Sequence, residues 1–134
     1  MRASALFAAA ALAGALAAPP AVAHPDWDYT GGCEVTVKYE PATGEYRGEA
    51  RVHVVATNTM GVPAPTTVIA VQCRFRHNGV AQGVVVEWSG VGAVALVAPV
   101  SMHVDLNDTY TVCDFVTVGG EAHPEVCHDI TVIG

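Results

Sequence analysis

Charged residues are scarce in this chain of 134 residues: they make up 14% of it, and lysine occurs only as Lys38. Thirteen acidic residues outnumber six basic ones, for a formal net charge of −7. This balance argues against a nucleic-acid partner, because phosphates are neutralised by clustered lysine and arginine. The chain also lacks the low apolar content of a disordered polymer, since 51% of its residues are apolar. We therefore expect a folded globular protein.

Motifs of catalysis are missing as well. The only serines are Ser4, Ser89 and Ser101, and none lies in a G-x-S-x-G sequence. No two cysteines have C-x-x-C spacing, so neither a thioredoxin-like motif nor a zinc knuckle has support. The carboxylates are scattered, without the spacing of an acid–base pair. We therefore predict a protein that is not an enzyme and has no resident cofactor.

The N-terminus has the features of a secretory signal peptide. Met1 and Arg2 give a positive start, residues 3–18 are apolar, and Ala21–Ala23 fits the small-x-small cleavage rule. The apolar run is shorter than the roughly 20 residues of a membrane-spanning helix. We predict a signal peptide over 1–23, a secreted product without a membrane anchor, an N-terminal segment over 24–32 and a β-sandwich domain over 33–134.

Four cysteines fit an oxidising compartment. An even number of cysteines in a small secreted domain predicts two disulfides. We favour Cys73–Cys113 with Cys33–Cys127, because long closed loops stabilise most in the chain-entropy model. The alternative is Cys33–Cys73 with Cys113–Cys127, the second of which would join a terminal hairpin.

Apolar and polar residues alternate from residue 33 onward, which is the period of strands with one buried face. Residues 33–40 and 46–56 are separated by turn residues and predict an antiparallel hairpin. The other strand-like segments are 67–77, 83–89, 93–98, 100–106, 110–118 and 127–133. No segment after the signal peptide has a convincing helical pattern, so about seven or eight strands packed as an antiparallel sandwich are expected.

Cys73, Trp88 and Cys113 occur in the order of the Cys…Trp…Cys signature of immunoglobulin domains, and the run 108–113 is similar to their tyrosine corner. The chain thus resembles small secreted immunoglobulin-like proteins of the actinobacterial type, which implies an all-β, disulfide-stapled sandwich. Tyr110 precedes Cys113 by three residues rather than two, so only the sandwich architecture is carried over. Size, secretion and two disulfides are also similar to the chromophore-carrying apoproteins of actinomycetes, which implies a small-ligand carrier.

Cleavage after Ala23 would make His24 the first residue. A terminal histidine can bind copper through its amine and ring nitrogens, which resembles the sites of periplasmic copper carriers and lytic polysaccharide monooxygenases. The candidates for a second ligand are His53, His103, His123 and His128. We take His24, His123 and His128 as candidate metal ligands. The competing interpretations are a frayed terminus and, over 121–129, a solvated loop closed by a disulfide.

Trp27 and Tyr29 stand beside Asp26 and Asp28, and we expect them to form an exposed recognition patch. A disulfide-tied scaffold with variable loops and no catalytic constellation predicts a secreted, non-enzymatic binding or extracellular interaction module. Its partner would be an extracellular protein or a small ligand. Copper binding through His24 and small-ligand carriage are the alternatives.

Overall fold

The computed structural model describes residues 26–134, so the predicted signal peptide and His24 lie outside the described residues. The described part is all-β, as predicted, and contains no helix that could cross a membrane. Its strands are β2 (Trp27–Glu40), β3 (Glu45–Asn58), β4 (Val68–His77), β5 (Val80–Val91), β6 (Ala93–Met102), β7 (Tyr110–Val118), β8 (Glu121–Ala122), β9 (Val126–Asp129) and β10 (Thr131–Ile133).

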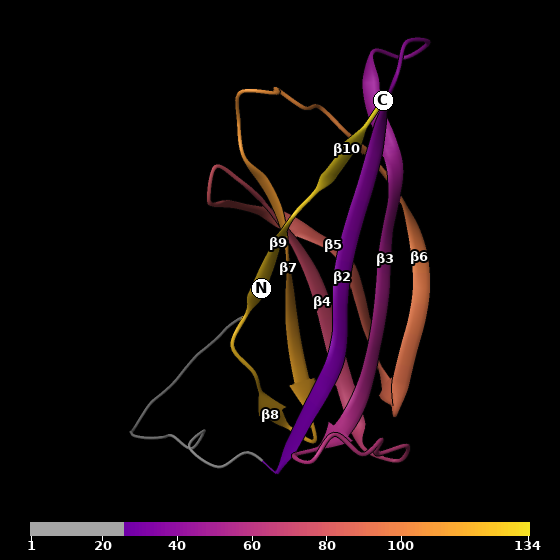
Figure 1. The fold of residues 1–134 in the computed structure, drawn as a ribbon, viewed down its shortest axis with the longest axis vertical. Helices are drawn as coiled ribbons and strands as arrows, with labels where there is room; N and C mark the ends of the chain where they lie inside the picture. Colours follow the sequence, from indigo (N-terminus) through magenta and orange to yellow (C-terminus); the bar gives the residue numbers. More distant parts are fainter. Residues whose placement is uncertain (1–25) are drawn as a thin grey trace.

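The strands form two sheets that pack against each other as a sandwich (Figure 1). One sheet has the order β10-β2-β3-β6, and the other has the order β5-β4-β7-β8, with β9 also paired to β7. Every pairing between these strands is antiparallel except that of β10 with β2. Each predicted strand segment therefore contributes to a two-layer, mostly antiparallel architecture.

The period-two pattern determines which side chains form the core. In β3, Val52 and Val54 are buried, whereas Arg51 and His53, which alternate with them, are exposed. Valine is frequent among the buried residues, and its branched side chain packs well on a pleated surface. Burying one valine side chain contributes about 1.5 kcal/mol or more. The core comprises Cys33, Val35, Val37, Ala50, Val52, Val54, Ala56, Ile69, Val71, Cys73, Val86, Val94, Val100, Val112, Val116 and Val118.

Three element boundaries differ from the prediction. β2 begins at Trp27, so most of the segment predicted over 24–32 belongs to a strand that pairs with β3 as far as Asn58. Residues 93–102 form one strand instead of the two that were predicted, because β3 pairs with this whole length. Conversely, the last predicted strand is divided at Ile130 into β9, which pairs with β7, and β10, which pairs with β2.

Two disulfides form, as predicted, but the favoured pairing is wrong and the alternative pairing is the one observed. Cys33 is bonded to Cys73, which joins the two sheets, and Cys113 is bonded to Cys127 on the neighbouring strand. The register explains the correction, because Cys73 lies opposite Asp114 and not opposite Cys113. Neighbouring residues of a strand point to opposite faces, so Cys113 points away from the core and cannot reach Cys73. Loop entropy, on which the preference rested, carries no information about this geometry.

Candidate functional site

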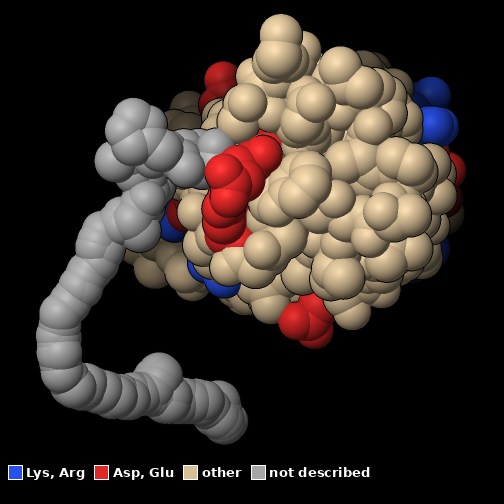
Figure 2. Space-filling model, turned by 90° about the horizontal axis from the view of Figure 1, so that it is seen from below, with Lys and Arg blue, Asp and Glu red and all other residues tan. Residues whose placement is uncertain are grey.

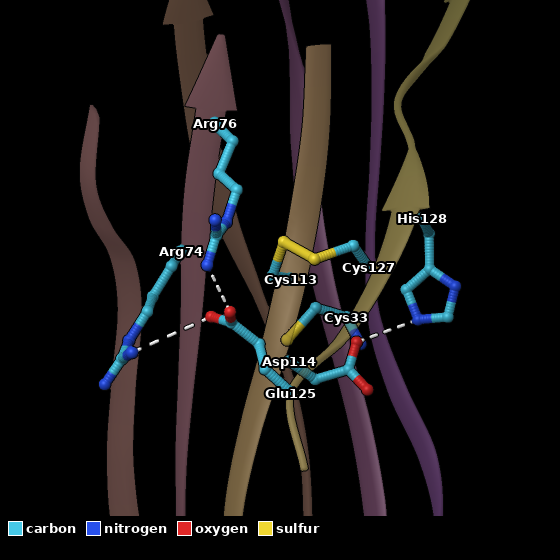
Figure 3. Close-up of a disulfide and its surroundings, with 8 residues drawn as sticks. All are labelled: Cys33, Arg74, Arg76, Cys113, Asp114, Glu125, Cys127 and His128. Carbon is cyan, nitrogen blue, oxygen red and sulfur yellow. Dashed lines mark hydrogen bonds and ion pairs between the residues drawn. A yellow bond between two sulfur atoms is a disulfide. The ribbon is translucent and has the colours of Figure 1, made fainter. Parts of the chain in front are cut away.

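Several of the residues predicted to have a functional role lie around one buried carboxylate, that of Asp114. Asp114 lies on the core-facing side of β7 and is 1% exposed. Its Oδ1 accepts hydrogen bonds from the Cys33 amide at 3.2 Å and from Nε2 of His128 at 2.8 Å (Figure 3). The Tyr29 phenol lies within electrostatic range of this carboxylate, and the Tyr29 ring meets that of His123 edge-on at 5.5 Å. A buried charge is tolerated only with such partners.

The Asp114 carboxylate also shapes the chemistry of Tyr29. Burial raises the pKa of the Tyr29 phenol, and the nearby negative charges of Asp114 and Asp28 raise it further. The phenol therefore stays protonated at neutral pH. Glu121 accepts hydrogen bonds from the amides of Asp26 and Trp27 at 3.1 and 3.4 Å. With the bond from the Cys33 amide to Asp114, these contacts occupy amides on the part of the β2 edge that β10 does not pair. Covering an edge in this way opposes pairing with foreign strands.

The predicted recognition patch is not exposed as expected. Trp27 and Tyr29 are both half-buried and pack against the core. The Trp27 ring lies so close over Gly119 that a side chain there would collide with it, and Gly119 has a φ of +58°. These rings are held inward because β2 continues through them and β7 and β8 lie beside it. A recognition role for Trp27 and Tyr29 stays a prediction.

The candidate metal ligands are not assembled into one set within residues 26–134. The only group of three or more donor atoms found close together in this range is Cys113, Glu125 and Cys127, and its two sulfur atoms are joined in the disulfide. His128 is occupied by Asp114, and His123 packs on Tyr29. The copper hypothesis therefore depends on His24, which lies outside the described residues.

A second polar cluster covers the outer face of the β4–β7–β9 region. Glu125 forms ion pairs with Arg76 and, at 3.7 Å, with Arg74 (Figure 3). The Arg74 guanidinium lies 4.3 Å from the centre of the Phe115 ring and donates to Oε1 of Gln72 at 2.7 Å. Both arginines are paired with the Glu125 carboxylate, so they offer little free positive charge to a ligand.

One end of the sandwich is almost uncharged. No Asp, Glu, Lys or Arg occurs in residues 54–73, 88–104 or 115–120, and these stretches include the β3–β4 loop and the β5–β6 and β7–β8 turns, which meet at the lower end in Figure 1. Figure 2 views this end and shows a broad uncharged surface with acidic side chains gathered beside it. We define the apolar end by its exposed residues Met60, Val62, Pro63, Pro65, Val68 and Val91.

The β3–β4 loop is rigid although it projects apolar side chains. Oδ1 of Asn58 accepts hydrogen bonds from the amides of Met60 at 2.9 Å and Val62 at 3.0 Å, and the Asn58 amide donates to the Val62 carbonyl at 2.9 Å. The rest of the loop is tied to its neighbours by a bond from the Gly92 amide to the Thr67 carbonyl at 2.9 Å. Gly92 has a φ of +79°, which favours glycine.

Met60 and Val62 are 87% and 56% exposed, so this preformed loop presents apolar area directly to water. Loops of soluble domains are ordinarily polar, and large exposed apolar patches mark interaction sites. Residues 58–66 lie between the predicted strand segments 46–56 and 67–77, and no binding role was predicted for them. One sequence feature could have indicated an exposed apolar loop here. The segment combines the turn-forming residues Gly61, Pro63 and Pro65 with a complete absence of charged residues.

The opposite end has a different character. There the β4–β5 turn and the β6–β7 loop surround a cavity of about 490 Å³, and histidine and aspartate side chains line its mouth. A larger hollow of about 740 Å³ lies over the outer face of β2, β3 and β6, and both spaces are open to solvent.

Comparison with protein-family models, curated proteins and solved structures finds no match to this chain.

Proposed function

We propose that the protein is an extracellular, non-enzymatic interaction module of immunoglobulin-like type that binds a partner protein through its apolar end. The predicted signal peptide and the two disulfides support an extracellular location, since disulfides persist in oxidising compartments. The exposed, rigid, uncharged loop around Met60 is the observation on which the binding function depends.

The immunoglobulin-like assignment is supported by strand order and by one side-chain contact. Strands β2, β3 and β6 of one sheet and β4, β7 and β9 of the other take the places of strands A, B, E and C, F, G in immunoglobulin domains. The Tyr110 hydroxyl accepts a hydrogen bond from the Asp105 amide at 2.9 Å, as a tyrosine corner does with upstream backbone. The disulfides differ from that pattern, because neither joins β3 to β7.

The position of the apolar end agrees with this assignment. In variable immunoglobulin domains the B–C and F–G loops lie at the binding end. The corresponding connections here are the β3–β4 loop and the turn after β7, and both lie at the same end of the sandwich as the apolar end (Figure 1). A recognition surface at this place would leave both sheets and the core unchanged.

The energetics favour a specific protein contact. Burial of the Met60 or Val62 side chain in a partner contributes about 1.5–3 kcal/mol each. Because the loop is already held by Asn58, little conformational entropy is lost on binding. The acidic Asp26, Asp28 and Glu121 lie beside this end, so the expected partner has an apolar centre and a basic rim. The same charges oppose anionic membranes and nucleic acid.

Two matched variants test the proposal. Met60→Asp places a charge in the apolar end, whereas Leu106→Asp places the same charge at another exposed apolar residue, 73% exposed, in the β6–β7 loop at the opposite end. Immobilised wild-type protein and both variants are incubated with extracellular proteins from cells that produce the chain. We expect wild type and Leu106→Asp to retain the same polypeptide and Met60→Asp to lose at least nine-tenths of it. Equal retention by all three proteins, or by none, would refute the proposal.

A further inference from the structure

The cavity of about 490 Å³ lies at the end opposite the apolar end, where the two sheets diverge. Its apolar wall consists of Phe75 from β4 and Met102 from β6, both of which are half-buried and pack against the core. Because these strands belong to different sheets, the cavity opens between the layers. Its volume is within the range of ligand sites, about 300–1,000 Å³.

Aromatic and hydrogen-bonded groups hold the mouth of the cavity in place. The rings of His77 and Tyr110 stack at a centroid distance of 4.6 Å with an interplanar angle of 9°. Nε2 of His77 lies 2.8 Å from Oδ2 of Asp108, and the Tyr110 hydroxyl accepts from the Asp105 amide. Asn78 further joins the β4–β5 turn to the β6–β7 loop, since its Oδ1 accepts from the Thr109 amide at 2.8 Å. The site is therefore preformed.

The charge at the mouth is negative. Asp105 and Asp108 both line the cavity, and the hydrogen bond from His77 lowers the pKa of the Asp108 carboxyl, with a smaller contribution from Asn78. The one arginine that lines the cavity, Arg76, is paired with Glu125. A positively charged group entering the mouth would thus meet two carboxylates and no unpaired cation among the lining residues.

We propose that this cavity binds a small organic cation with a flat apolar body, that is, an arylalkylamine. The flat body would lie against Phe75 and Met102, beside the stacked His77 and Tyr110 rings, and the ammonium group would face Asp105 and Asp108. The larger hollow over β2, β3 and β6 lacks this combination, because no Phe, Tyr or Trp ring lines it. This site is separate from the apolar end and does not depend on the function proposed for that end.

A titration followed by amide chemical shifts tests the proposal. Tryptamine is the cationic probe, and indole-3-acetate is the matched anion with the same ring. We expect tryptamine to give saturable shifts confined to residues 75–77 and 102–110, with an affinity at least tenfold above that of indole-3-acetate. Equal shifts from both compounds, or no saturable shift from tryptamine, would overturn the proposal.

Two variants locate the site, and a third is the control. Gln82→Trp obstructs the mouth from an exposed position on an edge strand, and we expect it to abolish the tryptamine shifts. Asp105→Asn keeps the oxygen that accepts from the Asn107 amide at 3.0 Å, and we expect about tenfold weaker tryptamine binding. Val97→Trp, which is exposed on β6 outside the cavity, should leave the affinity unchanged. Unchanged binding by both Gln82→Trp and Asp105→Asn would contradict the assignment.

Discussion

The two ends of this sandwich are built on the same core but present opposite chemistry. At the apolar end, Met60 and Val62 project into solvent from a loop without charge. At the other end, His77, Asp105 and Asp108 surround a cavity whose apolar wall lies inside the fold. A convex apolar surface suits contact with a second protein, whereas a concave apolar wall with a charged mouth suits a small molecule.

The loops at both ends are nevertheless held by the same kind of interaction, a hydrogen bond from a backbone amide to an asparagine side chain. The side-chain oxygen of Asn58 accepts from two loop amides at the apolar end, and that of Asn78 accepts from the Thr109 amide at the cavity end. An asparagine side chain can satisfy backbone amides that no strand partner reaches. The comparison shows that the core determines where the loops stand, while the residues in the loops determine what each end can bind.

The largest expected effect comes from a change that loosens both ends together. Replacing Cys33 and Cys73 with alanine removes the disulfide between the sheets, and its sequence separation of 40 residues predicts a loss of about 4 kcal/mol in the free energy of unfolding. Replacing Cys113 and Cys127, separated by 14 residues, should cost about 3 kcal/mol. Denaturant unfolding of both variants measures this order. A larger loss in the second variant would contradict it.

Substituting Asn58 and Asn78 one at a time should loosen one end of the sandwich without affecting the other. Asn58→Ala removes the acceptor for the Met60 and Val62 amides, and we expect a loss of about 1–2 kcal/mol. Hydrogen exchange should become faster at these two amides and stay unchanged at Thr109.

Asn78→Gly is the matched change at the cavity end, because Asn78 has a φ of +52° that glycine adopts without strain. It should accelerate exchange at Thr109 and leave Met60 and Val62 protected. If either substitution accelerates exchange at both ends, the ends are not independent.

A smaller effect on the unfolding free energy is expected from substitution of Tyr29, whose phenol lies near Asp114. The pKa of Tyr29 is raised in the folded protein, so its contribution to stability is fully present below the unfolded value of about 10 and is lost as pH rises through the folded value. Tyr29→Phe should make the alkaline decline in unfolding free energy shallower. An identical alkaline decline in wild type and variant would show that Tyr29 does not cause it.

The smallest effect on the unfolding free energy is expected at acidic pH, from substitution of Asp108 at the cavity end. The pKa of Asp108 is lowered in the folded protein, so its contribution is present above the unfolded value of about 3.9 and is lost as pH falls through the folded value. Asp108→Asn should make the unfolding free energy depend less on pH below about 4. Acid titration of both proteins checks this sign, and a steeper dependence in the variant would contradict it.

The strands were largely predictable because alternation is a local property. The hairpin of β2 and β3 follows from the turn residues between two alternating runs, and the turn at Asn78 and Gly79 has the positive φ values that Asn-Gly favours. The extent of the strands was less predictable, since Trp27–Gly32 joins β2 only because β3 is long enough to pair with it.

The contacts between strands were not predictable in this way. The disulfides depend on whether Cys113 points inward or outward relative to Cys73, and that depends on a register between strands far apart in the sequence. The burial of Asp114 was indicated only weakly by the sequence, because the residue alternates in phase with Val112 and Val116 on the inward face of β7. The donors that make its burial tolerable, the Cys33 amide and His128, come from distant strands.

The most direct measurement of the central claim is site-specific photo-crosslinking in a culture that produces the protein. Benzoylphenylalanine is placed at position 60 in one variant and at position 106 in another, two exposed apolar positions at opposite ends. We predict a covalent adduct with a discrete polypeptide from position 60 and none with that polypeptide from position 106. Adducts of equal yield from both positions, or no polypeptide adduct from position 60, would contradict the account.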